Sequence, residues 1–324
     1  TPANAMQAAE YAGRSGEELS TYRLALACTG EYAAFHGGTV DLTLAAMVNS
    51  INRVNEVYET EVSVRLIIID NNDILIELDG TTDPYTNGNT GIMIGESQDE
   101  ITAVIGSANF DIGHLFGTDS GGLAAVNSVC NAGTKASGVT GSGAPIGDSF
   151  DVDYVCHEVG HQFGGLHTQN NNCNRSSSSA YEPGSGSTIM GYSGICPPNL
   201  QGNSDPYFHV NSYDQIRAHV ENTDCDVVTA TGNNPPTVDA GGGGYVIPIS
   251  TPFELTGEAV DPDGDELTYS WEQFDLGPAT DTEADVNNPT GTAPIFRAWE
   301  PSESPTRVFP RITDLVNNTT VLGE

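Results

Sequence analysis

The chain has 324 residues, which is the length of about two typical domains. It carries 44 acidic residues against 10 basic ones, so its formal net charge is −34. Phosphate backbones and anionic lipid headgroups would repel such a chain, which excludes nucleic-acid binding and electrostatic docking to membranes. Hydrophobic residues make up 37% of the sequence, so the chain can bury a core. No apolar run is long enough to predict a transmembrane helix.

Six cysteines are spread over residues 28–225, and none of them forms a CxxC pair. An even number at wide spacing favours three disulfides in an oxidising compartment over six free thiols in the cytosol. The N-terminal residues lack the basic and apolar regions of a signal peptide. We therefore expect a mature secreted chain from which the signal has been removed.

The first two-thirds of the sequence predict strands that alternate with amphipathic helices, which is typical of an α/β unit. The predicted strands are 21–28, 62–70 and 109–116. The predicted helices are 39–58, capped by Thr39, a short one near 97–108, one that begins near Asp151, and 212–222. Ser212 and Gln215 form a capping-box pattern at the start of the last helix.

A compositional break rich in Gly, Asn and Pro covers residues 226–244 and predicts a linker. Beyond it, segments 252–260 and 267–274 alternate as β-strands do, which indicates a β-sandwich-like module. Too few apolar segments follow for a complete sandwich, so we expect the module to be incomplete. The predicted divisions are an N-terminal extension at 1–20, a main domain at 21–225, the linker at 226–244 and the partial module at 245–324.

Residues 157–167 read HEVGHQFGGLH. His157 and His161 are four residues apart, so on a helix they share one face and can bind one Zn²⁺. Glu158 is placed to reach a metal-bound water. Gly164 can end the helix, because glycine tolerates a positive φ, and return His167 as a third ligand. Three histidines leave one coordination position open, which indicates a catalytic zinc.

This pattern resembles the HExxHxxGxxH signature of the metzincin zinc endopeptidases, whose second signature is a turn that contains methionine. The segment STIMGYSG at 187–194 offers Met190 for that turn. With NFDIGHLFGTDSGGLAAVNSVCNAGTKASG and DYVCHEVGHQFGG, residues 20–225 resemble the adamalysin/reprolysin-like branch in a bacterial secreted form. The resemblance implies an α/β (α+β) catalytic domain with a twisted mixed sheet and an active-site helix. It also implies a latent zymogen whose pro-segment is absent from this chain.

The resemblance implies a zinc endopeptidase that hydrolyses peptide bonds through a zinc-bound water, with Glu158 as the general base. Tyr192 lies two residues after Met190. A tyrosine at that offset in astacin- and serralysin-like members can ligate zinc and stabilise the transition state, whereas the alternative is a tyrosine that lines the floor of the cleft. Adamalysins usually carry Asp after the third histidine, but this chain has Thr168, which leaves the subfamily open.

Peptide substrates of this clan lie extended along an edge strand. The resemblance places that strand at residues 121–127, with Gly121, Gly122, Leu123 and Ala124 in the substrate cleft. It implies that residues 193–199 wall the specificity pocket on the primed side. We expect protein or peptide substrates and a monomer.

The cysteines allow fifteen pairings. The pairs that we expect are Cys173–Cys196, Cys130–Cys225 and Cys28–Cys156. The first pair brackets the stretch from the third histidine to the methionine turn. The second resembles adamalysin bridges that tie the core to its last helix, and the third is what remains. A free Cys156 thiol, which is next to a zinc ligand, could instead join the metal.

Residues 261–271 read DPDGDELTYSW and resemble a loop of PKD- or cadherin-like extracellular modules. Asp261, Asp263 and Asp265 alternate along it, and such hard oxygen ligands suit Ca²⁺. The alternative is an acidic turn that is solvated and binds no ion.

Two other functions remain open beside the zinc endopeptidase. One is a catalytically inactive secreted binding or adhesion protein that keeps zinc structurally, although the intact Glu158 argues against it. The other is a zinc hydrolase that acts on a substrate other than a peptide.

Overall fold

A six-stranded mixed sheet forms the centre of the molecule in this computed structural model, which describes residues 15–119, 121–319 and 321–324. The strand order is β2–β1–β3–β5–β4, with β6 paired to β1. The strands are β1 (Glu18–Cys28), β2 (Val64–Ile68), β3 (Ile112–Gly117), β4 (Gly121–Ala124), β5 (Gly138–Gly141) and β6 (Val227–Ala230). The first three and β5 run parallel, while β4 and β6 run antiparallel to their neighbours. This arrangement confirms the expected α/β class with a mixed sheet.

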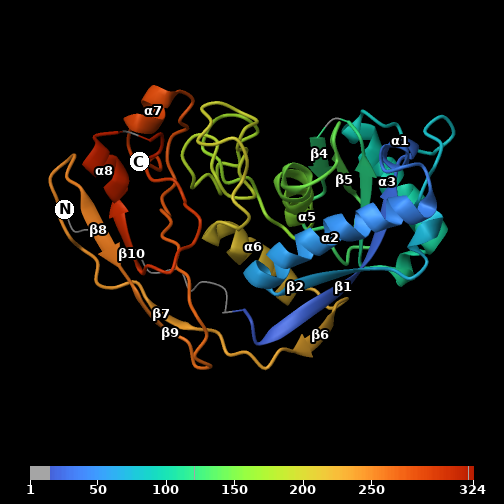
Figure 1. Cartoon of the computed structure of the whole chain (residues 1–324), viewed down its shortest axis with the longest axis horizontal. Helices are drawn as coiled ribbons and strands as arrows, with labels where there is room; N and C mark the ends of the chain where they lie inside the picture. Colours follow the sequence, from blue (N-terminus) through green and yellow to red (C-terminus); the bar gives the residue numbers. More distant parts are fainter. Residues whose placement is uncertain (1–14, 120, 320) are drawn as a thin grey trace.

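Helices cover both faces of this sheet (Figure 1). They are α1 (Gly30–Phe35), α2 (Val40–Val62), α3 (Thr90–Ile105), α4 (Asp148–Phe150), a π-helical turn (Asp151–Cys156), α5 (His157–Gln162) and α6 (Val210–Glu221). Side chains of β1 alternate between two apolar cores, as the period of a strand requires. Leu24 and Leu26 face the core beneath α2 and α5, whereas Ala25 and Ala27 face the core beneath α3.

The start of helix α3 differs from the sequence prediction, whereas that of α2 agrees with it. Helix α3 begins at Thr90 rather than near 97, because the Asn89 side chain accepts from the Ile92 amide and caps it. Gly91 and Gly95 weaken the helical pattern of this first part, which hid it in the sequence. Thr39 caps α2 as predicted.

The capping box expected at Ser212 is wrong. Helix α6 begins two residues earlier, and a ring nitrogen of His209 accepts from the Asn211 amide. The side chain of Gln215 is used elsewhere, because it accepts from the Leu166 amide and donates to the Ser179 hydroxyl.

The C-terminal region holds two two-stranded sheets and two short helices. They are β7 (Thr237–Asp239) with β9 (Glu258–Val260), β8 (Phe253–Thr256) with β10 (Thr306–Phe309), α7 (Glu283–Asn287) and α8 (Ile312–Asn317). The strand predicted at 267–274 is wrong, since this segment contributes only an isolated bridge at Tyr269. Strand β6 falls within the predicted linker and belongs to the central sheet. Residues 1–14 of the predicted N-terminal extension lie outside the described residues.

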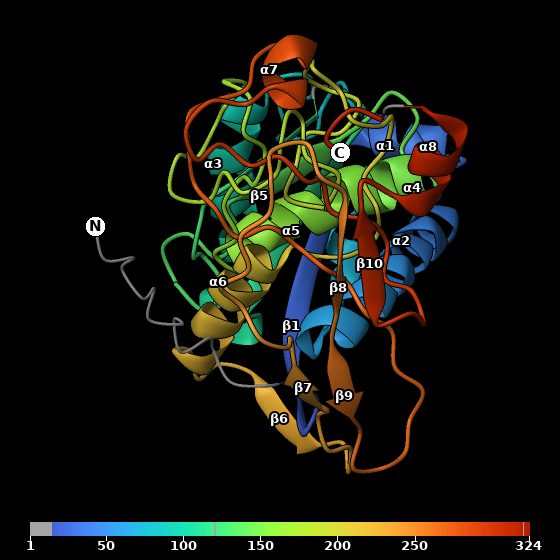
Figure 2. The same ribbon diagram turned by 90° about the vertical axis from the view of Figure 1, so that its left-hand side faces the viewer.

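The segment around Glu272 docks onto the start of α6, which explains why it leaves the β conformation. Glu272 accepts a hydrogen bond of 2.6 Å from the Val210 amide and lies 3.7 Å from His209. The ring of Phe274 stacks on that of Tyr181 at 4.1 Å between centroids. Figure 2 views the molecule from the side of the C-terminal region, with β8 and β10 in front of the central sheet and α7 at the top.

The structure contains the disulfides Cys130–Cys225 and Cys173–Cys196. The third expected pair is wrong, because Cys28 and Cys156 are free and buried. Both pack in the apolar core, where cysteine behaves as a small hydrophobic residue. Burial raises the pKa of Cys28 to about 12 and raises that of Cys156 further, so both thiols stay protonated. None of the described helices is both long and apolar enough to cross a membrane.

Thiol titration tests this cysteine arrangement. Under denaturing, non-reducing conditions, Ellman's reagent should find two free thiols per chain, and none should react in the folded protein because Cys28 and Cys156 are buried. A count of zero after denaturation would show that these two cysteines are paired after all.

The carboxyl of Glu61 near the end of α2 should make stability depend on pH. Burial, with Glu272 nearby, raises the pKa of Glu61 from 4.5 to about 7. The folded state therefore holds a proton that the unfolded chain releases, so this contribution is complete below about pH 4.5 and is lost as pH rises towards 7. The variant Glu61→Gln cannot ionise. Relative to wild type, its free energy of unfolding should be about 1–3 kcal/mol larger at pH 8 than at pH 5, which means that the variant is relatively more stable at pH 8.

Denaturant titrations of both proteins at the two pH values measure this difference. Because the variant and the wild type are compared at the same pH, contributions from other titrating groups cancel. An equal difference at pH 5 and pH 8 would show that Glu61 does not titrate in this range.

Candidate metal centre

Three histidines from two adjoining segments meet at one point. Helix α5 supplies His157 and His161 on one face, and the chain then turns and brings back His167. Their ligand nitrogens all lie within 4.8 Å of one another, and all three residues are buried. The Nε2 atoms of His161 and His167 are 3.0 Å apart.

Each of these rings is held by a backbone carbonyl through its other nitrogen. The Nδ1 atoms of His157, His161 and His167 lie 2.7 Å from the carbonyl oxygens of Ile189, Gly165 and Asn174, respectively. A carbonyl oxygen can only accept, so each Nδ1 carries the proton and each Nε2 keeps its lone pair. Lone pairs that converge at such short distances repel one another unless a cation lies between them. The donor set therefore fits a zinc ion.

The charge state of the rings also suits a metal. Burial lowers the pKa of His157 well below its usual value, lowers that of His161 to about 4 and lowers that of His167. The proximity of the rings to one another lowers the pKa of His157 and His161 further. All three imidazoles are thus neutral at pH 7, which is the form that binds metal.

Two glycines allow this geometry. Gly164 has a φ of +99° and ends α5, as the sequence predicts, so the chain can turn back towards the rings. A Cβ at Gly160 would lie 2.5 Å from the sulfur of Met190, so this glycine lets the methionine pack directly under the helix. Met190 is fully buried, and its carbonyl accepts from the Thr168 amide.

Glu158 lies beside the histidines with a free oxygen. Glu158 is only 6% exposed, and its Oε2 atom has no hydrogen-bond partner among the described residues. A Cβ at Gly122 would lie 2.2 Å from the Oε1 atom, so Glu158 packs against bare backbone of β4. Burial raises the pKa of Glu158 to about 8, and a cation among the rings would favour its charged form.

Tyr192 lies against the rings on another side. Its ring centroid is 4.6 Å from that of His167, and its hydroxyl accepts a hydrogen bond of 2.9 Å from the Asn174 side-chain amide. Asn174 therefore contacts both a histidine and the tyrosine. Nothing in the sequence indicated that this residue belongs to the site, because one of its two contacts uses only its backbone.

A second residue that the sequence analysis missed is Glu182, which is 1% exposed. Its carboxylate accepts from the hydroxyls of Thr168 and Thr188 at 2.5 and 2.6 Å and from the Ser187 amide at 2.8 Å. The residue after the third histidine is thus joined to the methionine turn by a buried carboxylate. Thr168, which departs from the adamalysin pattern, has the hydroxyl that this arrangement needs.

An open cleft runs between the histidines and the edge of the sheet. One cavity of about 210 Å³ is lined by Gly122, Leu123 and Ala124 on β4 and by Glu158, His161, His167 and Tyr192. A neighbouring cavity is lined by Gly121, His157 and Glu158. Strand β4 pairs with β5 on one side and is the last strand of the described sheet on the other.

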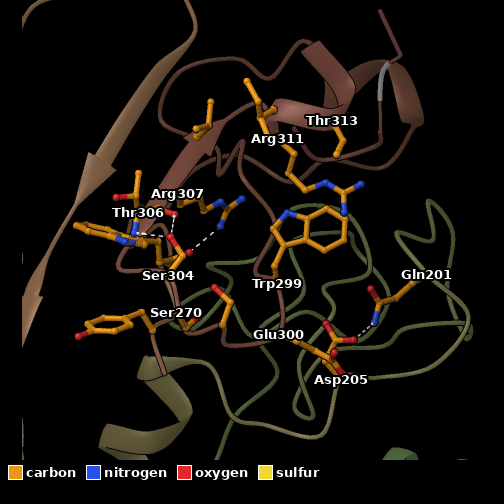
Figure 3. Close-up of a pocket in the computed structure, with 15 residues that line it drawn as sticks. Gln201, Asp205, Ser270, Trp299, Glu300, Ser304, Thr306, Arg307, Arg311 and Thr313 are labelled. Atoms are coloured by element: carbon orange, nitrogen blue, oxygen red, sulfur yellow. Dashed lines mark hydrogen bonds between the residues drawn. The ribbon is translucent and has the colours of Figure 1, made fainter. Parts of the chain in front are cut away.

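Two other features lie away from this centre. One is a cavity of about 570 Å³, which is lined by Gln201 and Asp205 on one side and by the C-terminal region on the other (Figure 3). In that cavity the Arg311 guanidinium lies 3.7 Å from the centre of the Trp299 ring. The Asp261, Asp263 and Asp265 carboxylates also gather within 4.8 Å. Because Asp261 accepts from the amides of the other two, hydrogen bonds account for this cluster, and calcium binding stays a prediction.

Within the described residues, the potential metal ligands that gather at the centre are the three histidines. The predicted alternative in which the Cys156 thiol joins the metal is not supported, because Cys156 is not a member of this group. His114 belongs to β3 and is not one of these ligands. Its two ring nitrogens contact Gln162 and Thr140 at 2.8 Å, so it joins α5 to the sheet.

Two of the comparisons with known proteins say nothing about the site. A solved structure titled "Structure of a chaperone-substrate complex" aligns with 62% of this chain at 17% identity and a TM-score of 0.41. This chain spans only 34% of that one, and so weak a similarity supports no conclusion about fold or function. No curated protein matches.

A family model described as "Metallo-peptidase family M12B Reprolysin-like" matches residues 19–219, which is well over half of the chain. Catalytic zinc is the cofactor of this family, and the three histidines can hold it. The chain therefore belongs to the reprolysin-like M12B family of metallopeptidases.

Proposed function

We propose that this protein is a secreted zinc endopeptidase that cleaves peptide bonds in proteins, with Glu158 as the general base. The observation that carries the proposal is the Oε2 atom of Glu158, which has no hydrogen-bond partner in the described part of the chain and lies beside three neutral histidines. A purely structural zinc would not need an unpaired buried carboxylate, which is costly to maintain. The two disulfides support an extracellular location.

The residues divide the chemistry among themselves. Zinc, when bound to His157, His161 and His167, supplies the Lewis acidity that polarises the scissile carbonyl and acidifies water. Glu158 takes a proton from the attacking water and returns it to the departing amine. The hydroxyl of Tyr192 lies on the same cleft and donates a hydrogen bond to the oxyanion.

Strand β4 provides the support for the substrate. Its outer edge faces the cleft, so an extended peptide can add to the sheet through main-chain hydrogen bonds. Gly121 and Gly122 leave that edge free of bulky side chains near Glu158. Main-chain recognition of this kind suits proteins as a substrate class and sets little sequence preference by itself.

Replacing the general base tests the mechanism. The variant Glu158→Gln should keep zinc and the fold but lower kcat on casein by about 10³-fold, because a neutral amide cannot accept the proton. The exposed Glu254→Gln is the matched control and should behave as wild type. Chelation should abolish wild-type turnover, and added zinc should restore it. Absence of casein cleavage by zinc-loaded wild type would favour the inactive binding protein, and cleavage of esters alone would favour a non-peptide hydrolase.

Removing one hydroxyl tests the role of Tyr192. The variant Tyr192→Phe keeps the ring against His167 and should lower kcat about 100-fold with little change in KM, because the hydrogen bond acts in the transition state. The exposed Tyr245→Phe serves as the control. If kcat of Tyr192→Phe matched that of the control, the tyrosine would only line the floor of the cleft.

A further inference from the structure

The third zinc ligand depends on a loop that has little regular structure of its own. Between His167 and Met190 the described backbone forms only an isolated bridge from Gln169 to Glu182. Asn174 in this loop accepts from the His167 ring through its carbonyl and donates to the Tyr192 hydroxyl through its side chain. The conformation of this one loop therefore sets the tautomer of a ligand and the position of a second active-site side chain.

A segment of the C-terminal region holds the same loop from outside. Thr280 donates through its amide to the Asn170 carbonyl at 3.1 Å, and its hydroxyl accepts from the Gly184 amide at 3.1 Å. Asp281 accepts from both the amide and the side chain of Asn172. Figure 1 shows the loop between α5 and this C-terminal region.

Two further contacts close the interface. The Asn170 side chain donates to the Pro278 carbonyl at 2.8 Å, and the Arg175 guanidinium donates to the Gly277 carbonyl at 2.8 Å. Arg175 also donates to the Asn170 side chain at 3.0 Å, so the two ends of segment 170–175 within the loop are joined to each other. Asn170 and Thr280 are almost fully buried, so water does not replace their hydrogen bonds.

We propose that residues 277–281 are a positioning element of the zinc site. They fix residues 170–175, and through the Asn174 carbonyl they fix the His167 ring in the tautomer whose Nε2 atom faces the metal. The C-terminal region is then part of the metal centre and not a separate appendage. The inference rests on the zinc site of the proposed function but does not need peptide hydrolysis.

Outer contacts of this kind change metal affinity without touching the metal. The variant Thr280→Val with Asp281→Ala removes the hydroxyl and the carboxylate that hold the loop. Its zinc affinity, measured by competition with a chromophoric chelator, should fall about tenfold. The ligand-field spectrum of the Co²⁺-loaded protein should shift, and kcat should fall more than KM changes.

The variant Asp275→Ala is the matched control, because this carboxylate accepts from Gln273 in its own segment. It removes the same charge nearby and should keep wild-type zinc affinity. Zinc affinity and Co²⁺ spectrum of the double variant equal to those of the control would overturn the proposal.

Circular dichroism checks that each variant is folded. If the double variant unfolds, Asp281→Ala alone decides, since its side chain is exposed and its loss leaves the core intact; about a threefold loss of zinc affinity is expected. Wild type that binds zinc but cleaves no protein would refute the proposed function, while the affinity comparison would still decide this inference.

Discussion

Three hydrogen bonds from histidine Nδ1 atoms to backbone carbonyls are the constraint on which the rest of the site depends. They fix which nitrogen of each ring is free, and so they decide that three lone pairs converge. The carbonyls belong to Gly165 at the end of the active-site helix, to Ile189 beside the methionine turn and to Asn174 in the intervening loop. All three segments must therefore be in place for the three free nitrogens to converge.

The fold meets this requirement with buried polar contacts instead of regular structure. Gln162, on the far side of α5, donates to the Gly113 carbonyl and contacts His114, which ties the helix to the sheet. Glu182 joins Thr168 to the methionine turn, and its charge is compensated by several donors that surround it. Contacts of this kind specify one geometry, because each loses its partner if the loop shifts.

The sequence predicted the parts of the site that follow from local spacing. His157, His161 and Gly164 lie within one helix and its end, so their geometry is set by the period of the helix. Strand β1 and helix α2 were predictable because they bury a periodic apolar pattern. Contacts made through backbone atoms, such as that of Asn174, carry no signal in residue type. The free Cys28 and Cys156 and the departure of segment 267–274 from a strand depend on tertiary packing, which a count of cysteines or a short alternating pattern does not contain.

Strand β4 ends the described sheet with an unpaired row of amides and carbonyls, which is useful for a substrate and hazardous for the protein itself. Two copies that met edge to edge could join their sheets and begin an aggregate. The net charge of −34 opposes that encounter, because like-charged molecules repel one another before their edges can align. An uncharged or basic segment meets no such barrier. The acidity of the chain thus disfavours pairing between two copies while leaving the open edge accessible to uncharged or basic segments.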